Sequence, residues 1–497
     1  MIKNKQALLR LIELIAFIIA FIILSTQLMN ALVIKGHSSE ARMYDVYEGY
    51  AQNSDVLFIG SSHAGQLVGR NLWRDYGIAS YTIAGNSQPI DVTYHSIVEF
   101  LKHSDPKVIM VETALIPDDN METPDTEYEG RIQSDAAFRY SVNYLKLASA
   151  QIKNFNLPLK TEGIQLLYKW PLMHDRYSSL TKDDFVIDTP YLVSDTLPLY
   201  SVPEEEAEIV TSEERAPISD IGRNYLDKTI KLCKEKNIQL VLFHTPYPAP
   251  ETTLAQQNTI SDIAAENNVP FIDFNYLVDE IGFDIHTDQA RDLNHVNLSG
   301  GEKITDYLGK YLIENYGIKD HRQDPGYETW DKDLKAWQVL QLKESFEKTN
   351  NIAEWSDLFA GQLSNYMVIL TLSGDYTSES DGSIQSILEK APVPEDFYEK
   401  GGTVILYRGN ILYYSGGCET YSYSHKFENA VVSIDRVASG SEDSPFEDGI
   451  YIWNENYIIN SDGLNVTIYD DSLDIVVDSI GVDACPDEGK LIRNEID

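Results

Sequence analysis

The sequence predicts an α/β domain in three layers, a parallel sheet covered by helices on both faces, between an N-terminal membrane helix and a C-terminal β-rich sandwich. Three observations support this prediction. An apolar run lies near the N-terminus, short Val/Ile/Leu/Phe-rich runs then alternate with helical patterns, and the sequence becomes β-rich after about residue 358. A chain of 497 residues is long enough for two such domains.

The N-terminal segment has the pattern of a membrane anchor. Three basic residues within the first ten precede an apolar run from Leu11 to Leu32, which is about the length needed to cross a bilayer. The positive-inside rule puts the N-terminus in the cytoplasm and everything after Lys35 outside. We therefore expect residues 1–35 to form a cytoplasmic tip and an uncleaved, single-pass signal anchor in the cell membrane. A cleaved signal peptide is the alternative, although no A-x-A-like cleavage site clearly follows.

Charge and cysteine content narrow the range of partners. With 78 acidic and 39 basic residues, the formal net charge is −39, which repels phosphates and predicts no nucleic-acid partner. The three cysteines are too few for a disulfide framework and match neither zinc nor redox spacing. At most one pair can form, and we favour Cys418 with Cys485 because both lie in the C-terminal part. We expect no cofactor and no bound metal.

Residues 36–320 carry the strand and helix alternation that is typical of a parallel sheet. The predicted strands are "SDVLFIG", "YTIAG", "PKVIMVETA", "IQLVLFHTPYP" and "VPFIDF", and two of the helical patterns are "DVTYHSIVEFLKH" and "GRNYLDKTIKLCKEKN". Residues from about 116 to 218 interrupt the rhythm, so we predict an insertion that forms a lid or one wall of a cleft. For its acidic piece "SVPEEEAEIV" we favour a solvated loop without a role.

The stretch "VLFIGSSHAGQ" ends a predicted strand in Gly60, Ser61 and Ser62, and a helix could begin at Ala64. Open α/β sheets carry their chemistry at such junctions. A helix N-terminus there offers free N–H groups and a positive dipole end, which stabilise a developing oxyanion beside a serine hydroxyl. The alternative is an ordinary N-cap serine.

A second motif lies far downstream, in "ARDLNHVNLSGG". Asp292 and His295 stand three residues apart, just before a predicted helix. In a turn, the carboxylate can bond one imidazole nitrogen and leave the other free, which is what a serine nucleophile needs from its base. Each motif is weak alone, and their order along the domain gives them meaning.

From about Ser54 to Tyr316 the chain resembles the SGNH, or GDSL-type, hydrolase and acyltransferase superfamily, whose fold is flavodoxin-like. The resemblance implies that Ser62 is the nucleophile, His295 its base and Asp292 the residue that orients the base. A two-step acyl transfer through an acyl-enzyme follows from these roles.

The resemblance also implies an oxyanion hole. The family's glycine block maps onto Gly85 in "YTIAGNSQP", so the N–H groups of Ser62 and Gly85 would bind the oxyanion, or the Asn86 side chain would contribute. Glu112, followed by Thr113, stands where the family has an asparagine. This departure is similar to the divergent branch that contains D-alanyl-lipoteichoic acid and alginate O-acetylation proteins, which are often membrane-anchored and act on surface polymers.

These observations predict an extracytoplasmic esterase or acyltransferase that removes or adds an O-acyl group, such as acetyl, on a cell-surface polysaccharide or cell-wall polymer. A membrane-bound O-acyltransferase is a candidate partner. The alternative is a catalytically silent SGNH-fold adaptor that binds glycan or such an acyltransferase, an idea that Glu112 keeps open. A metal-dependent hydrolase using His286 and His295 is a third hypothesis.

Three residues are candidates for substrate contact. They are His63, which follows the nucleophile and for which a surface role is the favoured interpretation, Glu112, and His244 at the end of a predicted strand. Asp284, His286 and Asp288 alternate in "FDIHTDQ", which could suggest a metal but is more typical of a solvated loop.

Residues 321–357 are predicted to form a linker and an amphipathic segment, and residues 358–497 a separate β-rich domain. This domain contains "YMVILTLSGDYTSESDGSIQSILEKA" and "GLNVTIYDDSLDIVVDSIGVDAC". On these stretches, most specifically Gly463 to Asp483, the chain between about Leu358 and Cys485 resembles the interleukin-like EMT inducer domain, which implies a non-catalytic module that could hold a glycan. Tyr451, Trp453 and Tyr457 could stack on sugar rings, although aromatic residues in strands pack in cores at least as often.

Overall fold

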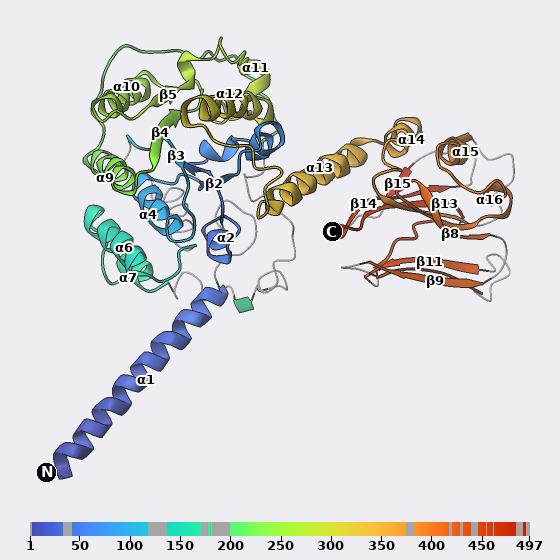
Figure 1. Ribbon diagram of the computed structural model, residues 1–497, viewed down its shortest axis with the longest axis horizontal. Coiled ribbons are helices and arrows are strands. Elements are labelled where there is room, and N and C mark those ends of the chain that lie inside the picture. The colour runs from blue at the N-terminus through green and yellow to red at the C-terminus, as the bar shows by residue number, and fades with distance from the viewer. Residues whose placement is uncertain are drawn as a thin grey trace. The chain divides into compact units, whose positions relative to one another are not determined.

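The computed structural model divides into two compact units, residues 1–334 and 335–497 (Figure 1). It describes residues 2–32, 42–117, 137–169, 177–178, 180, 199–373, 382–416, 420–427, 431–438, 446–453, 455–460, 462–483 and 491–493. Each unit has its own buried core. The predicted pair Cys418 and Cys485 lies outside the described residues, whereas Cys233 is a buried free thiol.

Helix α1 (Ile2–Leu32) is long and apolar enough to span a membrane. Its apolar span, Ala7–Met29, covers 23 residues; residues 7–24 are exposed, and Met29 at its end is buried. A helix of this length rises about 34 Å, slightly more than the hydrocarbon core of a bilayer. The observation supports a single-pass anchor.

The first unit is built on a five-stranded sheet in the order β2-β1-β3-β4-β5, and each pair of neighbouring strands is parallel. This confirms the predicted α/β class with a parallel sheet. Nearly every residue of the inner strands is buried, because helices cover both faces of such a sheet. The strands are β1 (Val56–Gly60), β2 (Ser80–Ala84), β3 (Val108–Glu112), β4 (Gln239–His244) and β5 (Phe271–Asp273).

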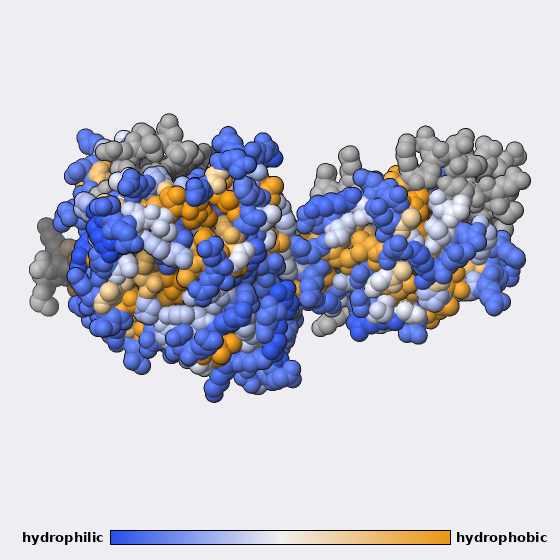
Figure 2. Space-filling model, turned by 90° about the horizontal axis from the view of Figure 1, so that it is seen from above, coloured by the Kyte–Doolittle hydropathy of each residue, from blue (hydrophilic) through white to orange (hydrophobic). Residues whose placement is uncertain are grey.

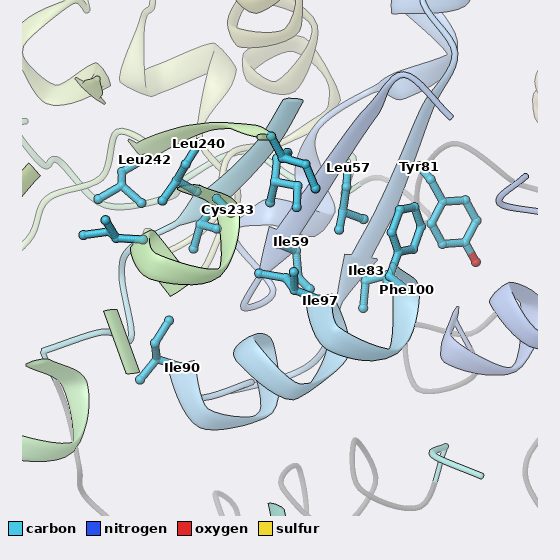
Figure 3. Close-up of a cluster of buried hydrophobic side chains, with 14 of the residues drawn as sticks. Leu57, Ile59, Tyr81, Ile83, Ile90, Ile97, Phe100, Cys233, Leu240 and Leu242 are labelled. Atoms are coloured by element: carbon cyan, nitrogen blue, oxygen red, sulfur yellow. The ribbon is translucent and has the colours of Figure 1, made fainter. Parts of the chain in front are cut away.

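Two hydrophobic clusters lie on opposite faces of this sheet, since alternate residues of a strand point to opposite sides. In β1, Leu57 and Ile59 belong to one cluster and Val56 and Phe58 to the other. Figure 3 shows the first cluster, where Leu57 and Ile59 lie near Phe100. Its helices are α2 (Arg42–Glu48), α4 (Ile90–Phe100), α9 (Asp220–Lys236) and α10 (Glu251–Glu266), and α12 (Leu298–Tyr316) covers the other face.

The described part of the predicted insertion contains two helices, α6 (Val142–Asn154) and α7 (Glu162–Leu167). They pack around a small cluster that includes Tyr144, Leu147 and Leu166 together with Val92 of α4. Residues 199–219 then run without regular secondary structure into α9. The alternation of the parallel sheet therefore resumes only after this segment.

Helix α13 (Glu328–Lys348) lies within residues 321–357, which the sequence predicts as a linker and an amphipathic segment. At its start Trp330 is buried, and its indole Nε1–H donates to the Ser80 carbonyl at 3.0 Å. The polar residues at the start of this helix predicted a linker, because a few large side chains rather than a regular apolar stripe hold the helix in place.

The second unit contains two antiparallel sheets, as the β-rich sequence predicts. Residues of both sheets, among them Ile369, Ile405, Ile434 and Ile450, share one buried cluster. The six-stranded sheet consists of β15 (Leu491–Arg493), β14 (Ile475–Asp483), β13 (Gly463–Asp470), β6 (Met367–Ser373), β7 (Gly402–Tyr407) and β8 (Asn410–Gly416). The four-stranded sheet consists of β12 (Glu455–Asn456), β11 (Phe446–Ile452), β10 (Val431–Ala438) and β9 (Tyr421–Lys426).

Helices α14 (Ile352–Ala360), α15 (Gly382–Leu388) and α16 (Phe397–Lys400) complete this unit. Of the three candidate sugar-stacking residues, Tyr457 is buried in the core, Tyr451 is half-buried and Trp453 is exposed. Hydrophilic residues cover much of the visible face of both units (Figure 2), as the composition leads one to expect. Only Trp453 thus offers a largely free ring face among the three.

Candidate active site

The nucleophile turn, residues Gly60–His63, follows the carboxyl end of β1, an inner strand of the sheet. The expected helix after it is not continuous. A 3₁₀ turn, η2 (Ala64–Gln66), comes first, Leu67 is extended, and α3 (Gly69–Asn71) and a π turn, η3 (Leu72–Tyr76), follow. A hydrogen bond to α12 favours this interruption of the helix: the Val68 N–H donates to the Thr305 hydroxyl at 2.9 Å. The turn therefore lacks the long helix dipole that the sequence suggested.

The structure brings Ser62, His295 and Asp292 together in one hydrogen-bonded chain. Ser62 Oγ lies 2.7 Å from His295 Nε2, and His295 Nδ1 lies 2.6 Å from Asp292 Oδ2. Ser62 and His295 are 233 positions apart in the sequence, so only the fold can bring them together. One imidazole nitrogen faces the carboxylate and the other faces the hydroxyl, which is the arrangement that activates a serine.

The loop between α11 (Ile285–Asp288) and α12 holds the Asp292 and His295 side chains. Asp292 Oδ1 accepts from the N–H groups of Asn294 at 3.0 Å and His295 at 3.1 Å. Leu293 between them has φ +60°, a left-handed conformation that costs a non-glycine residue energy. This tight turn, rather than a helical step, puts both side chains of the D-x-x-H motif on one side.

Hydrogen bonds keep Asp292 ionised. Burial disfavours its charge, but the bonds from the His295 side chain and backbone, the His295 charge and the Asn294 N–H together lower its pKa below the ordinary value. The side chains of His295 and Asp292 are 21% and 46% exposed. The triad therefore lies open to solvent, and a large molecule can reach it.

His63, for which the sequence favours a surface role, is instead 9% exposed beside the triad. Its ring centre lies 4.9 Å from that of His295 and 5.1 Å from that of Tyr247, and its Nδ1 is 3.1 Å from the Thr245 hydroxyl. Burial first, and then the neighbouring His295 and His244, lower its pKa to about 3. Sequence reasoning missed Thr245 and Tyr247, although "HTPYP" follows a strand that ends at the same sheet edge.

The neutral state of His63 predicts a pH effect on stability. Between its folded pKa of about 3 and the ordinary value of 6.5, the unfolded chain binds the extra proton, so acidification favours unfolding. When the pH falls from 7 to 5, the free energy of unfolding of the wild type should fall by about 2 kcal/mol more than that of the His63→Gln variant. Denaturant unfolding of the full chain in detergent at both pH values measures this difference. Equal pH dependence of the two proteins would contradict it.

Glu112 and His244 both lie beneath the surface of the site. Glu112 is 3% exposed and bonds the Ser61 hydroxyl at 2.7 Å, and burial, opposed by His244 and these hydrogen bonds, raises its pKa. His244 is fully buried, with Nδ1 3.1 Å from Asn275 Nδ2 and 3.3 Å from Asp273 Oδ1. In this conformation neither side chain faces solvent where a substrate would bind.

The predicted oxyanion donors lie at the ends of β1 and β2. Within the described part of the chain, the Ser62 N–H has no hydrogen-bond partner and is free to donate. The Gly85 N–H donates to the Gly60 carbonyl over a long 3.4 Å, and the Asn86 side chain is exposed. The oxyanion roles of these residues stay predictions.

The alternating residues of "FDIHTDQ" have separate structural partners. Asp284 accepts from the His286 N–H and begins α11, while Asp288 is buried against Ser299 and Lys303. His286 Nε2 faces Glu206 at 3.8 Å, not His295. Among the described residues, no three or more His, Cys, Asp or Glu side chains form a metal-binding group.

The acidic piece of the insertion, residues 201–210, is largely exposed and has no regular secondary structure, as the favoured solvated loop predicts, but its first residues contact the loop that carries Asp292 and His295. The Leu298 N–H donates to the Leu199 carbonyl at 2.8 Å, and Arg291 contacts both the Ser201 hydroxyl and the Glu204 carboxylate. The segment from Leu199 to Glu204 thus borders the loop that carries Asp292 and His295, beside the candidate site.

A cavity of about 750 Å³ lies along α12, away from the three triad residues. Two ion pairs line it, Arg74 with Asp75 and Lys310 with Asp306. The residues that line it are Asn71, Arg74, Asp75, Tyr76, Glu280, Ile281, Glu302, Lys303, Thr305, Asp306, Tyr307, Lys310, Tyr311 and Glu314.

Comparison of the chain with models of known protein families gives no match, and comparison with curated protein sequences gives none either.

Proposed function

We propose that this protein is a membrane-anchored, extracytoplasmic serine esterase or acyltransferase of the SGNH type. Its substrate would be an O-acyl group, such as acetyl, on a cell-surface polysaccharide or related cell-wall polymer. The observation that carries the proposal is the hydrogen-bonded chain from Ser62 through His295 to Asp292 at the carboxyl edge of a parallel sheet. Ligands of open α/β sheets bind at this edge.

The first half of the proposed reaction forms an acyl-enzyme. His295 Nε2 takes the hydroxyl proton of Ser62 while Oγ attacks the ester carbonyl, and Asp292 stabilises the imidazolium. The Ser62 N–H, which has no partner among the described residues, would donate to the oxyanion. Collapse of the tetrahedral intermediate breaks the ester C–O bond, and the leaving alcohol receives the proton from His295.

The second half returns the free enzyme. Water or a sugar hydroxyl gives a proton to His295 and attacks the acyl carbonyl, and Ser62 leaves with that proton. Water as acceptor makes the protein an esterase, and a sugar hydroxyl makes it an acyltransferase. A membrane-bound O-acyltransferase is the partner that would supply acyl groups in the second case.

The anchor and the openness of the site support a polymer at the cell surface as substrate. Lys3 and Lys5, which precede the apolar span of α1, favour an outside location for the part of the chain that follows this helix. His295 and Asp292 are partly exposed, so a long chain can lie across them without entering a closed cavity. In the second unit, the exposed Trp453 is the candidate for sugar stacking.

The second candidate function is a silent adaptor that binds glycan or a membrane acyltransferase. One observation favours it: Glu112, which stands where the resemblance expects an oxyanion-binding asparagine, is buried and bonded to the turn. An ionised carboxylate there cannot donate to an oxyanion. The two candidates differ in whether Ser62 is reactive.

Labelling by a fluorophosphonate, detected by intact mass on the full chain in detergent, separates these candidates. We expect one covalent adduct per chain, on Ser62, and release of p-nitrophenol from p-nitrophenyl acetate. Acetyl loss from an acetylated surface polysaccharide would then identify the substrate class. A folded wild-type chain that takes no label and cleaves no ester would contradict the esterase proposal and favour the adaptor.

A further inference from the structure

The Glu112 carboxylate lies directly beneath the nucleophile turn. Glu112 is the last residue of β3, which pairs with β1 in the sheet, and it is 3% exposed. Its Oε2 accepts from the Ser61 hydroxyl at 2.7 Å, and its Oε1 accepts from the Ala114 N–H. One side chain thus ties the turn after β1 to the turn after β3.

Gly60 leaves the space that Glu112 occupies. A Cβ atom on Gly60 would lie 2.6 Å from the Glu112 Cβ and 3.2 Å from its Oε2. Gly60 does not have a positive φ, so its backbone conformation does not require glycine. The need for space beside Glu112 explains why a glycine precedes the two serines.

The Ser61 hydroxyl connects Glu112 to both sides of Ser62. It donates to the carboxylate and accepts from the His63 N–H at 3.3 Å. Residues on either side of Ser62 are therefore held by one small network, which restricts the directions of the Ser62 Oγ and N–H.

Burying a carboxylate is costly, and an apolar side chain of similar size would serve the core at least as well. Two hydrogen bonds offset part of this cost, and both come from the two turns rather than from a distant part of the fold. This placement indicates that the network serves the geometry of the turn.

We propose that Glu112 is a positioning residue, which acts through Ser61 to hold the Ser62 hydroxyl toward His295 and the Ser62 N–H toward the oxyanion. The inference rests on the proposed function. It replaces the predicted substrate contact at Glu112 with an indirect role beneath the site. Since Glu112 touches neither substrate nor the reacting atoms, its removal should slow the reaction step and leave binding intact.

The test measures fluorophosphonate labelling kinetics of the full chain in detergent. For Glu112→Gln we expect the maximal labelling rate to fall about 10²-fold, because small displacements of a nucleophile cost this much. The probe concentration that gives half the maximal rate should stay unchanged. Ser61→Ala should slow labelling in the same way, and the double variant should be no slower than the slower single variant, because both changes cut one link.

Glu99→Gln is the matched control. Glu99 is also buried in the first unit, at 4% exposed, but it bonds Lys102 and Asn143 rather than the turn. This variant should label at the wild-type rate. Thermal unfolding of each variant checks that it is folded.

A wild-type labelling rate in folded Glu112→Gln would overturn the inference, and so would additive losses in the double variant. If Glu112→Gln does not fold, Ser61→Ala decides, and unchanged labelling there overturns the inference. A wild-type chain that takes no label would instead contradict the proposed function, so the two failures are distinguishable.

Discussion

Ser62→Ala is expected to abolish fluorophosphonate labelling and to lower esterase activity on p-nitrophenyl acetate by at least about 10⁴-fold. Without Oγ no acyl-enzyme forms, and His295 Nε2 loses the group 2.7 Å away from which it takes a proton. Triads act as a unit, so removing the nucleophile leaves only the contribution of the oxyanion donors and of binding. Intact mass and initial rates on the full chain measure the effect.

Ser61→Ala is the matched control for this prediction. Ser61 is the adjacent serine, but its hydroxyl bonds Glu112 instead of His295. The Ser61→Ala variant should still take one label per chain, more slowly than the wild type, whereas Ser62→Ala takes none. Undiminished ester cleavage by folded Ser62→Ala would contradict the assignment of the nucleophile.

Asp292→Asn should lower the rate of ester cleavage by about 10³- to 10⁴-fold. The amide has nearly the same shape, but its NH₂ donates to Nδ1 and cannot accept a proton from it. The imidazole then takes the tautomer that is protonated at Nε2. His295 then cannot take the proton of Ser62. The hydrogen bonds that lower the pKa of Asp292 show how strongly its ionised form is held in the wild type.

Rates as a function of p-nitrophenyl acetate concentration test this prediction. The loss should lie in kcat, with KM nearly unchanged, because Asp292 acts on the base and not on the ester. Asp284→Asn is the control, since Asp284 caps α11 and bonds no triad residue. Full activity of Asp292→Asn would show that His295 needs no carboxylate partner.

Much of the fold was predictable because strand signals are local. Short apolar runs predicted β1 to β5, and burial on both faces of the sheet explains why these runs are continuously apolar rather than alternating. The start of α13 was not predictable in this way, since Trp330 docks on Ser80, 250 positions away. The interruption of the helix after Gln66 likewise depends on a distant residue, because the Val68 N–H donates to the Thr305 hydroxyl.

Within the site, the order of two short motifs was enough to nominate Ser62, Asp292 and His295. Each motif alone also fits an ordinary capping role, and their order along the domain gave them weight. The sequence also identified His63, Glu112 and His244, but not their positions. All three are buried, and their roles depend on strands β3 and β4, which are distant in the chain.

The sequence by itself determined the apolar N-terminal helix, the α/β class of the first unit, the β-rich second unit and the residues of the candidate triad. These features follow from hydrophobic period and motif spacing, which each segment carries alone. Only the tertiary structure decided that Glu112 passes beneath Gly60, that His63 stays neutral beside His295, and that residues 199–204 border the loop that carries His295. Strand order and side-chain packing set these contacts, and both are properties of the whole unit rather than of any segment.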